Sequence, residues 1–393
     1  MVFIGIDVSS EKHDCCIVSE SRKVLKQFTF LNSSDGFKNF LEASLSLAAP
    51  EETKIGLEAT GVYGNNLVSF LRNNGFEVVT FNPLSVKKRL NANTLRKTKT
   101  DKADAKFLAL LLTQDNFKPD VEISYHISEL KSLSRARLQL VEECSKYKTR
   151  AKALLTELFP EFNRLFSHSF CNTELAILAS YPSAKDLASA RARKLAAIID
   201  SSSNGHYRSN FTEEVIELAR HSIGTYSETK AMQLQFCIRQ IEIISEYIHK
   251  YDTSIKSIMK EINSPILTIP GISFTLGAMI LGEIGDISRF SSPAKVLAFA
   301  GLEPSVYQSG KYSAASGSMV KRGSRYLRWA IGQASRIVPK FDEIFGAYLE
   351  KKRSEGKHYN VACSHVAKKL VRVIYGILKN NTEYSSTYSP VAA

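Results

Sequence analysis

The sequence predicts an α/β domain at the start of the chain and a mainly α-helical remainder. In the first hundred residues, short β-rich runs alternate with helical patterns, as they do in an α/β domain. From about residue 128 onward, apolar residues recur with a helical period, and two stretches repeat every seven residues. The chain has 393 residues, which exceeds the size of a single hydrophobic core. We therefore expect three domains, at residues 1–125, 126–262 and 263–393.

The first domain is expected to hold five strands. Alternating apolar residues bounded by turn residues place them at 2–7, 15–18, 24–30, 54–57 and 77–81. Ser34 and Asp35 are candidate caps for a helix after the third strand, and a second helix ends at Asn74 and Gly75 before the fifth strand. Three consecutive strands followed by alternating helices and strands form the element order of the RNase H fold.

The second domain is expected to contain two long helices with heptad repeats. Apolar residues three and four positions apart form the seam of a coiled coil, so we expect the two helices to pair in this way. The core of an ordinary helical bundle would give the same pattern. Residues 160–225, between the repeats, are expected to form short helices and loops. The first repeat comprises Leu133, Leu140, Tyr147 and Leu154, with Cys144, Ala151 and Leu158 four residues after the last three, and the second comprises Leu234, Ile241, Ile248 and Ile255, alternating with Cys237, Ile244, Tyr251 and Ile258.

The third domain is expected to be α-helical and to begin with a turn that could bind phosphate. Between Ile266 and Ile272, Pro-Gly precedes an apolar helix, which resembles a helix-hairpin-helix whose turn offers backbone N–H groups to phosphate. An ordinary turn would have the same residues. Further helices are expected at 294–300, 325–337, 341–351 and 361–379.

The composition indicates a partner that carries negative charge. Lys and Arg total 52 against 39 Asp and Glu, a formal net charge of +13 at pH 7. This excess is typical of nucleic-acid-binding proteins, although some basic proteins are merely soluble. The six cysteines form no CxxC pair and have no histidine at metal-ligand spacing, so we expect neither zinc nor disulfides. Because no signal-type or membrane-spanning apolar run stands out, we expect a cytoplasmic protein without membrane contact.

Four carboxylates occupy positions where two-metal chemistry would need them. Asp7 ends the first expected strand, and Glu58 follows the fourth. Asp101 and Asp104 lie one helical turn apart at the start of a helix. Mg²⁺ takes oxygen ligands, and a pair of these ions clamps the attacking and leaving oxygens of a phosphoryl transfer. Each residue alone has a simpler explanation, such as Asp101 as a helix N-cap, but together the four predict a site for two Mg²⁺ ions.

A cationic run lies just before the paired aspartates. It comprises Lys87, Lys88, Arg89, Arg96, Lys97 and Lys99. Basic side chains beside a metal site would hold the substrate backbone while the metals act on it. A solvated run of surface charge is the alternative.

A serine near the C-terminus is a candidate nucleophile. Ser309 precedes a glycine, so its hydroxyl could be presented without steric cover, and Lys321, Arg322 and Arg328 could neutralise a phosphate under attack. No catalytic triad is visible, so a metal or a neighbouring base would have to activate the hydroxyl. An ordinary turn serine fits the same residues.

Several ordered motifs resemble one family. This is the DEDD insertion-sequence transposase family, which is related to the Piv DNA invertase and has members described as bridge-RNA-guided recombinases. The similarity covers nearly the whole chain. The motifs are IGIDVS at the start, GLEATGVYG around Glu58, KTDKADAKFLA around Asp101 and Asp104, LTIPGI, AGLEPS, QSG and KRGSRYLRWA.

The resemblance implies a RuvC-like RNase H domain, a helical coiled-coil middle and a C-terminal transposase domain with a nucleophilic serine. Ser309 falls on the family serine, and the DEDD metal ligands fall on Asp7, Glu58, Asp101 and Asp104. The acidic site and the serine would then form a composite site, which two protomers could share. The resemblance further implies donor and target DNA, a structured non-coding guide RNA, and a homo-oligomer that we expect to be a tetramer.

One departure from the family keeps the serine assignment open. The family often has Ile-Ser before Lys-Arg-Gly, where this chain has Met319 and Val320. That change removes one competing serine, but others remain close to Ser309, namely Ser313, Ser316 and Ser318. Two other functions also stay open. One is a Holliday-junction nuclease that uses the acidic residues with water as the nucleophile, and the other is a nucleic-acid-binding protein that has lost catalysis.

Overall fold

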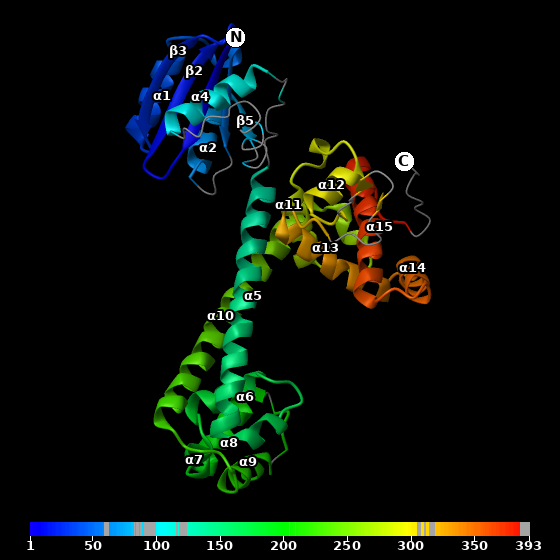
Figure 1. Cartoon of the computed structure of the whole chain (residues 1–393). Helices are drawn as coiled ribbons and strands as arrows, with labels where there is room; N and C mark the ends of the chain where they lie inside the picture. The colour runs from blue at the N-terminus through cyan, green and yellow to red at the C-terminus, as the bar shows by residue number, and fades with distance from the viewer. Residues whose placement is uncertain are drawn as a thin grey trace. The chain divides into compact units, whose positions relative to one another are not determined.

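The chain divides into two compact units, Met1–Glu122 and Ile123–Ala393. Figure 1 shows their elements coloured by position in the sequence. The computed structural model describes residues 1–58, 63–81, 83, 86, 89, 100–114, 117, 124–203, 205–208, 210–304, 308–309, 312–313 and 319–385.

The first unit is built on a five-stranded mixed sheet (Figure 1). In space the order is β3-β2-β1-β4-β5, with β1 antiparallel to β2 and parallel to β4. The five predicted strands and their order along the chain are confirmed, although the second begins at Lys12 rather than Cys15. The strands are β1 (Val2–Val8), β2 (Lys12–Ser19), β3 (Val24–Leu31), β4 (Thr53–Glu58) and β5 (Glu77–Phe81).

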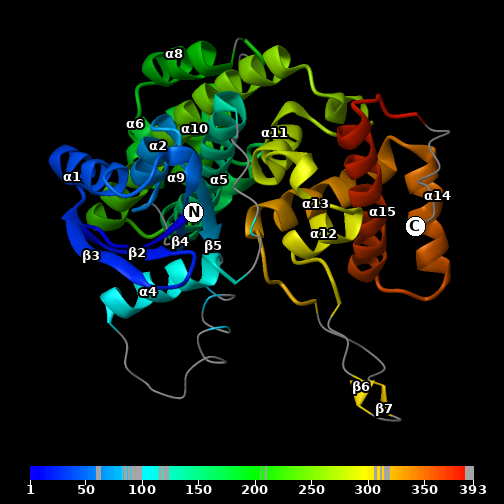
Figure 2. The same cartoon turned by 90° about the horizontal axis from the view of Figure 1, so that it is seen from above.

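Helices cover both faces of this sheet (Figure 2). On one face, α1 (Ser34–Leu45) and α2 (Asn65–Asn73) pack their apolar side chains against the strands. The hydroxyl of Ser33 accepts a hydrogen bond from the Gly36 N–H at 3.2 Å, so Ser33 caps α1 and the predicted caps Ser34 and Asp35 are wrong. The opposite face is covered by α4 (Asp101–Leu112).

A glycine in β1 allows α4 to lie against the sheet. A Cβ atom at Gly5 would stand 2.1 Å from the carbonyl oxygen of Ala105 and 2.3 Å from the backbone nitrogen of Ala109. Any side chain at this position would therefore push the helix away from the strand. The close approach fixes the middle of α4, at Ala105 and Ala109, relative to β1.

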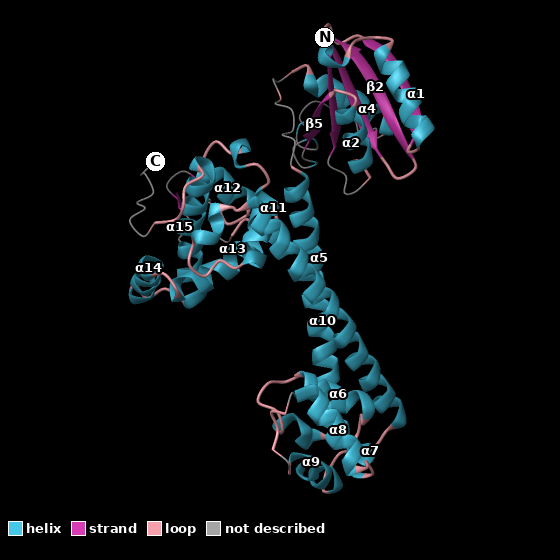
Figure 3. Ribbon diagram, turned by 180° about the vertical axis from the view of Figure 1, so that it is seen from behind, coloured by secondary structure: helices cyan, strands magenta, loops and turns pink. Residues whose placement is uncertain are grey.

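The second unit is organised around two long helices, α5 (Tyr125–Leu158) and α10 (Glu228–Ile262) (Figure 3). They run antiparallel, because Arg137 of α5 binds Asp252 of α10 at 2.5 Å while Lys230 pairs with Glu157 at their other ends. The two predicted long helices are therefore present and packed along each other. The supercoil of a coiled coil stays a prediction.

Each end of this helix pair carries its own hydrophobic core. One core includes α6 (Asn172–Ser180), α7 (Ala184–Ala188), α8 (Ala192–Ser203) and α9 (Phe211–Arg220). The other includes α11 (Phe274–Ile284), α12 (Pro293–Phe299), α13 (Arg325–Ile337), α14 (Glu343–Ser354) and α15 (Tyr359–Asn380). Within the described ranges, no helix combines the length and apolar character needed to cross a membrane.

Candidate active site

Asp7 and Glu58 lie at the carboxyl ends of neighbouring parallel strands. Gly5 of β1 pairs with Gly56 of β4, so Asp7 and Glu58, each two residues further on, stand at the same level of the sheet. Side chains alternate between the two faces of a strand, and both glycines lie under α4. The two carboxylates therefore project from the α4 face, where both are half-buried.

The first turn of α4 supplies two more carboxylates. Asp104 is half-buried and Asp101 is exposed. Neither is the N-cap, because the hydroxyl of Thr100 accepts a hydrogen bond from the Ala103 N–H at 3.2 Å. The interpretation of Asp101 as a simple helix cap is therefore wrong.

Asp7 is the electrostatic centre of this group. The pKa of its carboxyl is raised from 3.8 to about 6, first by burial and then by the negative charges of Asp104, Asp101 and Glu58, in that order. All four predicted acidic residues thus act within one small region of the first unit. A cation bound beside the Asp7 carboxylate would therefore be strongly favoured.

A fifth carboxylate in this region was missed by the sequence interpretation. Asp14 of β2 lies directly opposite Asp7 in the antiparallel ladder, is only 5% exposed, and also raises the pKa of Asp7. Its Oδ1 accepts a hydrogen bond from the Thr29 hydroxyl at 2.6 Å. The predicted strand began at Cys15, so it left Asp14 in a turn. A strand beginning at Lys12 would have placed it opposite Asp7.

The carboxylates do not form a closed metal cage. In the part of the chain that the structure describes, no group of three or more His, Cys, Asp or Glu side chains lies close enough together to hold a metal ion. The donor set is nevertheless composed of oxygen atoms, which Mg²⁺ prefers. Binding would require these side chains to move toward a common point.

The predicted cationic run lies almost entirely outside the described residues. This applies to Lys87, Lys88, Arg96, Lys97 and Lys99. Arg89 is described, and its guanidinium lies 5.5 Å from the centre of the Phe117 ring.

Ser309 belongs to a short hairpin in the second unit. It ends β6 (Gln308–Ser309) and pairs with Tyr312 of β7 (Tyr312–Ser313). The side chains of this hairpin are not among those described, and Ser316 and Ser318 lie outside the described residues altogether. The structure therefore locates the backbone of Ser309 and leaves the choice among the neighbouring serines as a prediction.

The base of this hairpin is held by backbone and side-chain contacts. Pro304 and Met319 form an isolated β-bridge, and the Val320 N–H donates to the Glu303 carbonyl at 2.9 Å. Nη1 of Arg328 donates to the carbonyls of Ala300 at 3.2 Å and Lys321 at 3.1 Å. Arg328 therefore links the segments at Ala300 and Lys321, and the side chains of Lys321 and Arg322 are exposed.

The sequence interpretation also missed a buried carboxylate that contacts the N-cap of α13 (Arg325–Ile337). The side chain of Glu283 in α11 is 1% exposed and accepts hydrogen bonds from Arg135 at 2.5 and 2.9 Å and from the Ser324 hydroxyl at 2.6 Å. Ser324 also caps α13, since its Oγ accepts from the Leu327 N–H at 3.0 Å. Arg135 is 148 residues from Glu283, and no local sequence pattern reveals such a pairing.

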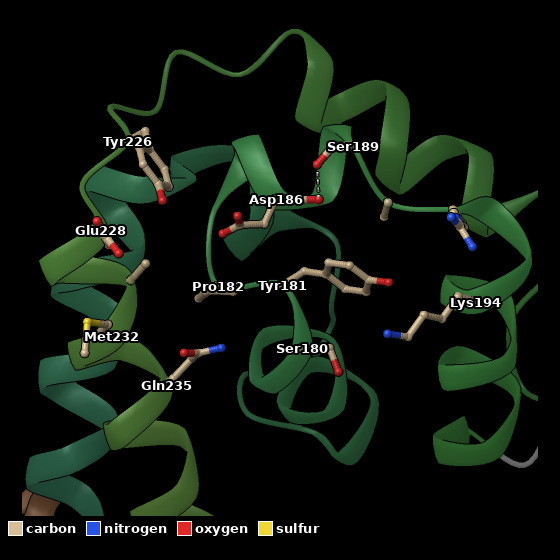
Figure 4. Close-up of a pocket in the computed structure, with 13 residues that line it drawn as sticks. Ser180, Tyr181, Pro182, Asp186, Ser189, Lys194, Tyr226, Glu228, Met232 and Gln235 are labelled. Atoms are coloured by element: carbon tan, nitrogen blue, oxygen red, sulfur yellow. Dashed lines mark hydrogen bonds between the residues drawn. The ribbon is translucent and has the colours of Figure 1, made fainter.

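A separate cavity of about 560 Å³ opens between α6, α7, α8 and α10 (Figure 4). Tyr181, Asp186 and Lys194 are among its lining residues, and Tyr226 stands at its edge with the Lys185 ammonium 4.1 Å from its ring. None of the predicted site residues lines this cavity. It does not form part of the candidate active site.

Comparison with known proteins places the chain among the transposases, a class of DNA recombination enzymes. A DEDD transposase model of the IS110 type matches residues 4–160, and a model described as transposase IS116/IS110/IS902 family matches residues 263–350. The chain belongs to this IS110-type transposase family.

Individual relatives span the whole chain. A 44.8 kDa protein of insertion element IS116 from Streptomyces clavuligerus is 22% identical over 96% of this chain and 95% of its own. The pilin gene-inverting protein of Moraxella bovis is 24% identical over 97% of both chains. Among solved structures, T. thermophilus RuvC in complex with a Holliday junction matches 28% of this chain and 90% of its own, with 17% identity and a TM-score of 0.22.

Proposed function

We propose that this transposase cuts and rejoins DNA strands by Mg²⁺-dependent phosphoryl transfer with a serine nucleophile. The observation that supports it most is that Asp7 and Glu58 stand at neighbouring strand ends on the face covered by α4, whose first turn carries Asp101 and Asp104; besides burial, the charges of Asp104, Asp101 and Glu58 also raise the pKa of Asp7. Like charges gathered at one point are costly for a fold, and active sites are a common reason for such an arrangement.

Two Mg²⁺ ions would be held by Asp7, Glu58, Asp101 and Asp104. When bound, the ions would stabilise the negative charge that develops on the phosphate during transfer. The chain's own contribution is to hold two carboxylates at the carboxyl ends of the inner strands β1 and β4 and two in the first turn of α4. The raised pKa of Asp7 fits a site built for a cation, because a cation would remove the repulsion.

Ser309 would supply the attacking oxygen. Its Oγ forms a bond to the phosphorus of a DNA phosphodiester, the bond from phosphorus to one deoxyribose oxygen breaks, and the serine proton is passed to that leaving oxygen. The strand end stays linked to the protein until a deoxyribose hydroxyl attacks the same phosphorus and releases the serine. Cleavage and rejoining would then need no external energy source, because the link conserves a phosphodiester.

Cationic side chains would hold the nucleic acid around both groups. Those that precede Asp101 in the sequence are Lys87, Lys88, Arg89, Arg96, Lys97 and Lys99, and those that follow Ser309 in the sequence are Lys321, Arg322 and Arg328. We include a structured non-coding guide RNA and a homo-oligomer, expected to be a tetramer, in the proposal. RNA that copurifies with the protein and maps beside its gene would support the guide. Nuclease-treated protein with full sequence-specific activity would exclude it.

The acidic site is tested by replacing one carboxylate at a time. Asp7→Asn, Glu58→Gln and Asp104→Asn should each abolish recombination while DNA binding stays within about threefold of the wild type, because a metal ligand and not a core contact is lost. Glu77→Gln is the matched control, since Glu77 is exposed at the opposite end of the sheet, at the start of β5. Normal recombination by Asp104→Asn would refute the two-metal proposal.

A further inference from the structure

We propose that the outer face of α10 binds α10 of a second copy of this chain in antiparallel orientation. Four large apolar side chains are exposed along this face: Met232 at 64%, Phe236 at 49%, Ile243 at 50% and Tyr247 at 47%. The residues of α10 that are buried, such as Leu234 and Ile241, belong to the core shared with α5. The exposed four, which we call the outer stripe, are not among the buried residues of this core, although the Phe236 ring contacts Tyr147 of α5 and Met232 lines the cavity described above.

The outer stripe is self-complementary. Its intervals are four, seven and four residues, which place all its members on one helical face and read the same in both directions. A two-fold axis that passes between Arg239 and Gln240 therefore sets Met232 opposite the partner's Tyr247. The same axis sets Phe236 opposite the partner's Ile243. A contact of this kind buries the same patch on both copies, as a two-fold interface requires.

The charges on this face match in the same register. Lys250 comes opposite the partner's Thr229, one residue from the partner's Glu228; within the chain Lys250 and Glu228 are both exposed. Lys250 already pairs with Glu246 in its own helix at 2.6 Å, and its ammonium has further donors for a second carboxylate. A parallel pairing would instead set each charge beside its own copy. The charges thus favour the antiparallel arrangement.

A second copy of this chain is the occupant that this pattern fits. Exposed apolar stripes of this length mark contact surfaces on soluble proteins, and both the spacing and the charges of this one are complementary to itself. This inference rests on the homo-oligomer in the proposed function and adds the surface that would form one of its contacts. It does not depend on the chemistry of the active site.

A disulfide crosslink tests the register. In the full-length protein, Met232→Cys combined with Tyr247→Cys should give a covalent dimer under mild oxidation, because the two positions meet only across the interface. Within one helix they lie about 22 Å apart, too far for a disulfide. Each single variant is a matched control and should give less than about one tenth of the dimer. Equal crosslinking by Met232→Cys alone would overturn the antiparallel register.

Mass measurement by light scattering tests the surface itself. Phe236→Glu combined with Ile243→Glu should weaken association at least tenfold, whereas Ser245→Glu, an exposed site outside the stripe, should not. Glu228→Lys and Lys250→Glu should each weaken it, and the double reversal should restore it. The two residues lie about 33 Å apart within one helix, so rescue can only act between chains. An oligomer of unchanged mass in Phe236→Glu/Ile243→Glu would reject this surface while leaving the homo-oligomer intact, and a monomeric wild type would reject both.

Discussion

Arg135 of α5 and Glu283 of α11 form a two-bonded ion pair with N–O distances of 2.5 and 2.9 Å, although 148 residues separate them in the sequence. Ser324 donates to the same carboxylate at 2.6 Å and begins the helix that follows the serine hairpin. One buried carboxylate therefore links the long helix α5 to the N-terminus of α13. Burial acts to raise the pKa of Glu283, but the hydrogen bonds from Arg135 and Ser324 outweigh it and hold the pKa below 4.5.

Arg135→Met should destabilise the second unit by roughly 2–3 kcal/mol at neutral pH, because it leaves the buried carboxylate of Glu283 without its cationic partner. Since the folded pKa of Glu283 is lowered, its contribution is present above pH 4.5 and is lost as the pH falls. The difference between wild type and variant should thus shrink in acid. Urea unfolding followed by the fluorescence of Trp329 in α13, the only tryptophan, measures this. Lys146→Met, on the exposed side of α5, is the control.

Ser324→Ala should cost about 1–2 kcal/mol, because it removes both the helix cap and the hydrogen bond to Glu283. Ser324→Thr keeps a hydroxyl that can make both bonds and should remain within about 0.5 kcal/mol of the wild type. The same urea experiment applies. Equal stability of the alanine and wild-type proteins would show that the bond to Glu283 contributes nothing.

Asp7→Asn should stabilise the metal-free first unit, because burial and, after it, repulsion by the neighbouring carboxylates both disfavour the ionised Asp7. The pKa of Asp7 is raised from 3.8 to about 6, so its ionisation weakens the fold as the pH rises through that window. The variant should gain about 1–3 kcal/mol above pH 6 and nothing below pH 4. Amide hydrogen exchange in β1 and β4, with and without Mg²⁺, measures this. A variant that is less stable than the wild type at both pH values would contradict the electrostatic account.

Replacing Lys87, Lys88 and Arg89 with alanine should weaken DNA binding and reduce its salt dependence. Each phosphate contact that is lost lowers the slope of log affinity against log salt by roughly one unit. Binding titrations between about 50 and 200 mM salt would show the change. Lys38→Ala, an exposed cation on α1, should leave the slope as it is. A slope that also stays constant in the triple variant would mean that the cationic run faces solvent.

Much of the first unit could be predicted because its patterns are local. The alternation of apolar residues determines the five strands, and Asp7 and Glu58 follow from where β1 and β4 end. The register between strands is not local, and for that reason Asp14 was missed. The helix caps were assigned to the wrong residues for a different reason: several neighbouring polar side chains near the start of a helix can each act as the cap.

The second unit shows the opposite limit. Heptad spacing predicted two long helices, but it could not reveal that Arg135 on one of them pairs with a carboxylate in α11. The exposed apolar residues of α10 were also not predicted, because a heptad repeat identifies the packed face of a helix and says little about its exposed face. Contacts between distant segments require the tertiary structure.

The most direct test of the proposed chemistry is a trapping experiment with a DNA substrate nicked beside the cleavage point. Wild-type protein should form a denaturation-resistant adduct in Mg²⁺, and peptide mapping should place the link between Tyr307 and Lys311. Ser309→Ala and Asp7→Asn should both lose it, the first for want of the nucleophile and the second for want of a metal ligand. An adduct that survives in Ser309→Ala but is lost in Ser313→Ala, Ser316→Ala or Ser318→Ala would move the nucleophile along the loop. Cleavage that depends on Asp7 but never yields an adduct would contradict the serine mechanism and favour a nuclease that uses water.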